Sequence, residues 1–119
     1  MTDVKDLLIN TLENAFGYDV ILQGSMSDDA KYPDSFFTYF NNETSDTLFF
    51  DNNETVVIWD FDLNIYSNDP AIVNSALVTA KQVLKEQGFI IDGVGHDVLS
   101  DEPSHTGRGI TVLYVEKVR

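Results

Sequence analysis

The segment Thr55–Ser67 reads TVVIWDFDLNIYS and alternates strictly between two kinds of side chain. Bulky apolar residues occupy every second position, and the positions between them are mostly polar. Successive side chains of a strand point to opposite faces, so a period of two predicts a long strand with one face against a core. The expected core face carries Val57, Trp59, Phe61, Leu63 and Ile65, and the other face carries Ile58, Asp60, Asp62, Asn64 and Tyr66.

Two further segments have the three- and four-residue apolar spacing of amphipathic helices. The first covers residues 3–16 and is followed by Gly17, which suits a left-handed helix end. The second runs from Pro70 to about Gln87, with Asp69 placed to cap it and Gly88 to end it. We therefore expect a helix on each side of the long strand in the sequence.

The other elements are shorter and less regular. Strands are predicted at residues 18–22, 36–40, 47–50, 94–100 and 110–118, with a further strand beginning at 89–91. Residues 41–46 and 51–54 are expected to be turns, and residues 92–109, which contain several glycines, are expected to be irregular. The order of elements predicts one α+β domain over residues 1–119, with two helices on one face of a largely antiparallel sheet.

The composition is acidic: 20 Asp and Glu stand against 7 Lys and Arg, a net charge of −13. Such a surface repels phosphates, so we expect no sequence-specific contact with nucleic acid. The remaining explanations of the negative charge are a basic protein partner, a surface past which DNA slides, or solubility alone. The chain has no cysteine and no apolar run long enough for a membrane helix or a signal peptide. We therefore expect an intracellular protein that does not enter a membrane.

Two groups of residues could carry chemistry. His96, Asp101 and His105 could bind a metal, but their spacing fits no standard motif, and the alternative is a mobile loop. Asp60 and Asp62 share a strand face at about 7 Å, a separation that acid–base chemistry can use. The alternative is a solvated strand face, because nothing in the pattern buries these carboxyl groups. We expect no enzyme and no cofactor.

Three features could serve contacts instead. Trp59 and Phe61 could line a ligand pocket, although their place on the apolar face favours core packing. Arg108 lies between two glycines and is either part of a flexible turn or offered to a carboxylate of a neighbouring subunit. The last strand is apolar on both faces, as in a central strand or a subunit interface.

Several of these features together resemble the small tail-terminator and tail-completion (head–tail joining) proteins of long-tailed bacteriophages and prophages. They are the first amphipathic helix, Tyr32-Pro33 before residues 36–40, the long strand ending in Ser67-Asn68-Asp69-Pro70, the helix closing at residues 84–89, and the final apolar strand. The likeness follows most of the chain in order, and it includes no catalytic signature.

This resemblance implies a non-enzymatic structural protein that forms a ring, usually a hexamer, in the bacterial cytoplasm during assembly and then in the virion tail. The ring would cap the tail tube and meet the head connector. Net acidity fits a lumen that conducts DNA. A ring needs sheet faces or edges that pair between copies, and residues 110–118 and 36–50 could supply them. The expected subunit interface is Arg108, Ile110, Val112, Tyr114, Phe36 and Phe37. The expected acidic rim is Asp28, Asp29, Asp34, Glu43, Asp46, Asp51 and Glu54.

Two hypotheses of other classes stay open. An acidic inhibitor that mimics DNA would bind a basic nucleic-acid-binding protein, and that binding would weaken as salt is added. A small hydrolase or metal-dependent enzyme would use His96, Asp101 and His105.

Overall fold

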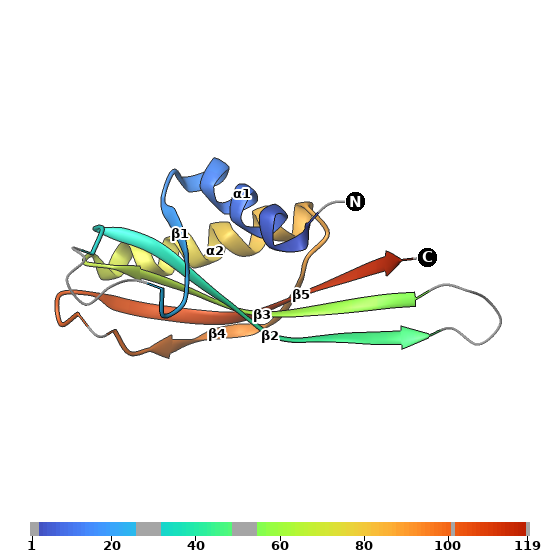
Figure 1. Cartoon of the computed structure of the whole chain (residues 1–119). Helices are drawn as coiled ribbons and strands as arrows, with labels where there is room; N and C mark the ends of the chain where they lie inside the picture. Colours follow the sequence, from blue (N-terminus) through green and yellow to red (C-terminus); the bar gives the residue numbers. More distant parts are fainter. Residues whose placement is uncertain (1–2, 26–31, 49–54, 101, 119) are drawn as a thin grey trace.

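The computed structural model describes residues 3–25, 32–48, 55–100 and 102–118, with the backbone alone at residues 43–48, 55 and 117–118. Two helices and five strands occur in these ranges (Figure 1). Their order is α1 (Val4–Phe16), β1 (Asp19–Leu22), β2 (Ser35–Leu48), β3 (Thr55–Ser67), α2 (Pro70–Glu86), β4 (Ile90–Val98) and β5 (Thr106–Val118).

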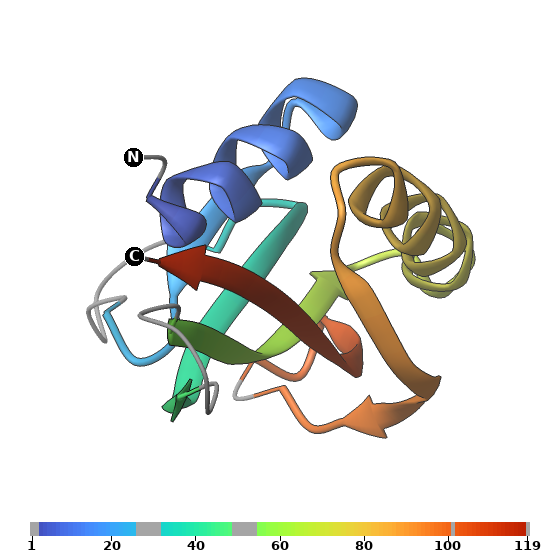
Figure 2. The ribbon, with the colours of Figure 1, turned by 90° about the vertical axis from the view of Figure 1, so that its right-hand side faces the viewer.

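The strands form one sheet in the order β1-β2-β3-β5-β4. The β1–β2 pair is parallel, and the other three pairs are antiparallel. Figures 1 and 2 show both helices on the same face of a strongly twisted sheet. The α+β fold that the sequence predicts is therefore confirmed.

The alternation of β3 sets the position of the core. Phe61, Leu63 and Ile65 are buried beneath the helices, and Trp59 packs against the edge of the same core. Trp59 stacks on Phe61 with ring centroids 6.1 Å apart, and its indole Nε1 donates to Glu116 Oε1 at 3.3 Å. These two rings therefore belong to the core rather than to a ligand pocket.

The start of each helix is capped by an aspartate. Asp3 accepts a hydrogen bond from the backbone N–H of Lys5 at 2.9 Å, and Asp69 accepts one from the N–H of Ala71 at 3.0 Å. Pro70 follows Asp69 at the first helical position, where a missing N–H costs nothing. The N–H of Asp69 donates in turn to the fully buried hydroxyl of Ser67. The end of β3 and the start of α2 are thus fixed together.

Replacing Asp69 by alanine should lower the free energy of unfolding by about 1 kcal/mol, because the first turn of α2 loses its cap. Asp69→Asn keeps an acceptor oxygen and should retain most of the stability. Asn74→Ala, at an exposed position of the same helix, is the matched control and should stay within about 0.5 kcal/mol of the parent. Urea denaturation measures all three. Equal losses for Asp69→Ala and Asn74→Ala would contradict the capping role.

Three expected boundaries are wrong. Strand β2 runs unbroken through residues 41–46, where a turn was expected, and a register shift between Asn41 and Glu43 lets pairing with β3 continue. Strand β4 likewise runs across residues 92–96 through a shift. Gly93 and Gly95 lie inside that shift with φ of 88° and 104°, which glycine adopts without strain. Strand β5 begins at Thr106 rather than at Ile110.

The early start of β5 has a packing cause. Gly107 lies directly beside Tyr66, where an added Cβ would approach the ring carbons to 2.7 Å. Gly109 lies in the same way against Asn64. These glycines are strand residues that let larger neighbours cross them, and glycine composition alone suggests a loop instead.

Candidate self-association surface

The face of the sheet opposite the helices carries a mixed apolar and acidic surface, which we call the open face. Cross-strand register aligns its side chains in rows. One row pairs Ile58 with Val115, and the next aligns Asp60, Leu113 and Ile90. A third row aligns Phe40, Asp62, Thr111 and Asp92.

The apolar side chains of the open face are only partly covered. Phe40, Val115 and Ile90 keep 46%, 44% and 50% of their surface exposed, whereas Asp60 and Asp62 are half-buried among them. Large apolar side chains left exposed on one face of a sheet are typical of a contact surface, and here Ile90 and Val115 lie on adjacent strands, with Phe40 farther across the face on β2. The open face therefore suits a partner better than it suits bulk water.

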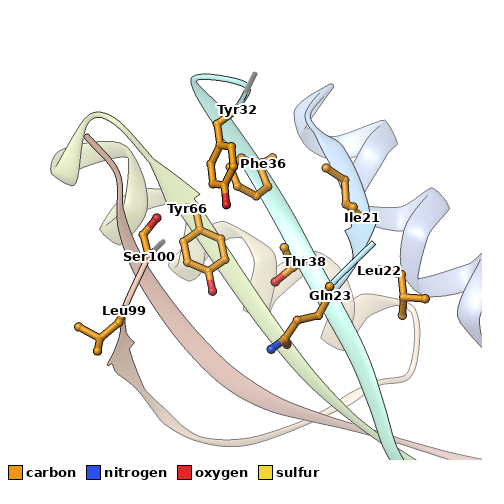
Figure 3. A pocket seen from close by; sticks show the side chains of 10 residues that line it. Ile21, Leu22, Gln23, Tyr32, Phe36, Thr38, Tyr66, Leu99 and Ser100 are labelled. Atoms are coloured by element: carbon orange, nitrogen blue, oxygen red, sulfur yellow. The ribbon is translucent and has the colours of Figure 1, made fainter. Parts of the chain in front are cut away.

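An aromatic cluster occupies the end of the open face nearest β1 (Figure 3). Phe36 stacks on Tyr66 at 5.3 Å between ring centroids and meets Tyr32 edge-on at 5.5 Å. A cavity of about 230 Å³ opens beside these rings, and its lining includes Gln23 and Thr38. Only neutral side chains line this cavity within the described chain, so it offers shape and hydroxyl groups rather than an acid–base pair.

His105 is a structural residue of the same cluster. Its side chain is 8% exposed, and its Nε2 lies 2.8 Å from the carbonyl oxygen of Pro33, to which it donates. Its Nδ1 lies 2.9 Å from the hydroxyl of Ser104. Both ring nitrogens are therefore engaged, and His105 ties the segment before β5 to the start of β2.

The structure gives the metal hypothesis no support. His96 lies exposed on β4, and Asp101 is outside the described residues. Among residues 3–25, 32–48, 55–100 and 102–118, no three His, Asp or Glu side chains gather closely enough to hold a metal ion. Asp60 and Asp62 lie on the open face as expected, and Asn42 Nδ2 is 3.5 Å from Asp60 Oδ1.

Arg108 has a partner within its own chain. Its Nη1 donates to Asp97 Oδ1 at 2.7 Å, across the β4–β5 pair. The two residues are opposite each other in the register, so regular strand pairing brings the charges together. The expectations of a flexible turn and of an arginine free for a neighbouring subunit are both replaced by this ion pair.

Replacing Asp97 by asparagine should change the free energy of unfolding by less than about 1 kcal/mol, because the carboxylate is 88% exposed and solvent screens the pair. Urea denaturation at low and high salt measures the change, which should shrink as salt is added. A loss above about 2 kcal/mol that does not respond to salt would show that the pair is more important than its exposure indicates.

The residues expected at a subunit interface are mostly inside the protomer. Ile110, Val112 and Phe37 are 2%, 0% and 0% exposed, because the register sets Ile110 opposite Leu63, Val112 opposite Phe61 and Phe37 opposite Ile65 on the helix-covered face. Phe36 is 3% exposed within the aromatic cluster, and Tyr114 packs on Phe89 at 4.9 Å. The four buried side chains are not a surface that a second copy could touch, whereas Tyr114 is only partly buried. The exposed apolar side of β5 is that of Val115.

The expected acidic rim is only partly placed. Asp34 is exposed and accepts a hydrogen bond from Asn68 Nδ2 at 3.1 Å. Glu43 and Asp46 belong to strand β2 rather than to a turn. Asp28, Asp29, Asp51 and Glu54 lie outside the described residues.

Two strand edges that have no partner strand within the described residues complete the surface. Strand β1 pairs with β2 only from Phe36 to Tyr39, and β4 pairs with β5 only between Val112–Leu113 and Gly107. Beyond those points the described chain supplies no strand to the outer side of β2 or of β5. The end of the sheet at which only β2, β3 and β5 pair within the described chain projects to the right in Figure 1, beyond the helices. The sequence indicated that residues 36–50 and 110–118 could pair between copies, but how much of each edge lacks a neighbouring strand depends on how short the flanking pairings are.

No protein-family model matches the chain, and no curated protein matches its sequence. The two described helices are each too short or too polar to cross a membrane.

Proposed function

We propose that this chain is a non-enzymatic structural protein of the tail-terminator or head–tail joining kind. In this proposal copies assemble into a ring that caps a phage tail tube and meets the head connector. The observation that carries self-assembly is the projecting end of the sheet, which has one open face and two edges that no other strand of the described chain covers. Exposed edges are templates for another chain, and natural monomers usually protect them.

The phage assignment rests on the resemblance in sequence order, together with features of the fold that suit it. A cap on a tube needs a rigid body that presents contact surfaces in a fixed direction, and here two capped helices brace one end of a long sheet. The described residues that line the aromatic cavity are all neutral, which suits a binding surface better than a catalytic centre.

Electrostatics support a ring through which DNA passes. The net charge of −13 repels phosphates, so DNA would slide past without being held. Asp60, Asp62 and Asp92 lie on the open face between its apolar side chains. We propose that these carboxylates face the channel, since the helices occupy the opposite face.

The decisive experiment is to measure the mass of the purified protein by light scattering and native mass spectrometry over a range of concentrations. The expected result is a single closed oligomer, which negative-stain electron microscopy should show as a ring with a central hole. Mixing it with purified tail tubes from the same phage or prophage should place the ring at tube ends. An assembly that grows without a size limit, or a ring that ignores tube ends, would contradict the proposal.

Because the net charge is −13, the second candidate function is an inhibitor that mimics DNA. Asp60 and Asp62 repeat at about 7 Å along β3, and Asp92 shares a row with Asp62. This alternative predicts a monomer that binds a basic nucleic-acid-binding protein, with affinity falling steeply as salt is raised. A stable ring with no affinity for basic proteins would exclude it.

A further inference from the structure

The two unpaired edges lie level with each other at the projecting end of the sheet. Thr44 of β2 and Tyr114 of β5 are both opposite Trp59, and Leu48 and Val118 are both opposite Thr55. The end is therefore a three-stranded ribbon, made of residues 44–48, 55–59 and 114–118, with β3 in the middle.

The outer strands of this ribbon run in the same direction, because each is antiparallel to β3. A copy placed alongside in the same orientation would therefore bring β5 of one protomer next to β2 of the other as a parallel pair. Such a contact uses two different surfaces, so it can repeat from copy to copy, and it closes into a ring when the rotation per copy divides a full turn.

We propose that the ring is closed by this pairing: the outer edge of β5 at residues 114–118 pairs in parallel with the outer edge of β2 at residues 44–48 of the next copy. The inference deepens the proposed function, since it names the contact that makes the ring. Every copy then satisfies both of its edges, and the backbone N–H and C=O groups on them gain partners.

Sequence favours this pairing over pairing of like edges. Residues 40–48 read FNNETSDTL and include two acids with no base, so two β2 edges set against each other would repel. Residues 114–118 read YVEKV, with one charge of each sign. Pairing β2 with β2, or β5 with β5, would also leave the other edge of each copy open. The β2 segment contains neither the proline nor the lysine that commonly blocks an edge.

Closure has a defined direction. Both helices lie on one face, so a sheet that curls toward the open face keeps them outside the ring, whereas the reverse curl would force them together at the centre (Figure 2). The open face then lines the channel. If six copies contribute three strands each, the barrel wall is about 35 Å across at a strand tilt of about 40°, and side chains leave a lumen of about 25 Å. Such a lumen admits double-stranded DNA.

Cysteine cross-linking tests the pairing directly, because the chain has no cysteine of its own. Ser45 and Val115 are both opposite Ile58, so they occupy the same row on the two edges. Within one copy the two positions are two strand spacings apart, about 10 Å, which is too far for a disulfide, whereas the proposed neighbours in adjacent copies are about 5 Å apart. The double variant Ser45→Cys/Val115→Cys, oxidised to form disulfides, should therefore give a ladder of covalent oligomers that ends at the ring size. Each single variant should give none, and an equal mixture of the two should stop at dimers.

A matched control combines Ser45→Cys with Val78→Cys, which lies 66% exposed on α2 and should give no ladder. Circular dichroism confirms that each variant is folded. Dimers from Ser45→Cys alone, with no ladder from the double variant, would show that like edges pair and would overturn the inference. A ring by native mass that does not cross-link would overturn the inference while leaving the proposed function intact. A monomer at every concentration, with no cross-linked product, would count against both.

Discussion

Replacing Phe37 by alanine should lower the free energy of unfolding by about 3–5 kcal/mol, the range found when a buried phenylalanine is truncated. Phe37 is 0% exposed and lies opposite Ile65 in the core. Its ring contacts Phe16 of α1 at 5.1 Å and Tyr18 at 6.3 Å between centroids. The substitution therefore removes a contact that holds the end of α1 to the sheet.

Phe40→Ala is the matched control for this prediction. It makes the same chemical change three residues along the same strand, but Phe40 lies 46% exposed on the open face. Its loss should stay below about 1 kcal/mol in the isolated protomer. Urea denaturation followed by the fluorescence of Trp59 measures both variants. Similar losses at the two positions would show that the helices do not cover the face assigned to them.

Replacing Gly109 by alanine should cost about 1–3 kcal/mol, the usual range for added volume in a packed site. A Cβ at this position would collide with Asn64 Oδ1 and would lie 3.1 Å from both His96 Nε2 and Val98 Cγ1. Asn64 has little room to move, because it is buried and its Nδ2 donates to Thr38 Oγ1 at 3.4 Å. The strain would therefore reach both neighbours of β5.

A double-mutant cycle with Asn64→Ala identifies the cause. Asn64→Ala removes the oxygen that the new methyl group meets, so the double variant should be more stable than the sum of the single losses predicts, by about 0.5–3 kcal/mol. Thermal unfolding of the four proteins measures this coupling. Simple additivity would mean that the cost of Gly109→Ala lies elsewhere, for example against His96 or Val98.

The regular parts of the fold could be predicted because their patterns are local. Alternation over Thr55–Ser67 gave the central strand and the face that holds Phe61 and Leu63. Apolar spacing and the Asp69-Pro70 pair gave α2, and Gly17 gave the end of α1 at φ 73°. Each of these signals depends on residues within a few positions of one another, so no knowledge of the rest of the chain was needed.

The expectations that failed depend on partners distant in sequence. Polar residues 41–46 look like a turn, yet pairing with the long strand β3 satisfies their backbone and keeps them extended. Gly107 and Gly109 look like a loop, yet they are strand positions crossed by Tyr66 and Asn64. Arg108 looks available, yet the β4–β5 register sets it opposite Asp97.

The candidate surface could be predicted only in outline. The sequence indicated that β5 is apolar on both faces, but it did not say which side is free. Register with β3 assigns Ile110 and Val112 to the core and leaves Val115 exposed. Of the interface residues proposed from the sequence, Ile110, Val112 and Phe37 therefore lie on the helix-covered face. The members of the open face on β3, such as Asp60 and Asp62, are those that the alternation predicted.

By itself the sequence determined the class of the fold, the two helices, the covered face of the central strand and the acidity of the whole protein. Periodicity and capping depend on residues only a few positions apart, and composition does not depend on the order of residues at all. Only the tertiary structure decided where the sheet ends. Whether an edge is paired depends on the length and register of the neighbouring strands. The backbone groups that form these hydrogen bonds are the same in nearly every residue, so the side-chain sequence does not reveal which of them are paired.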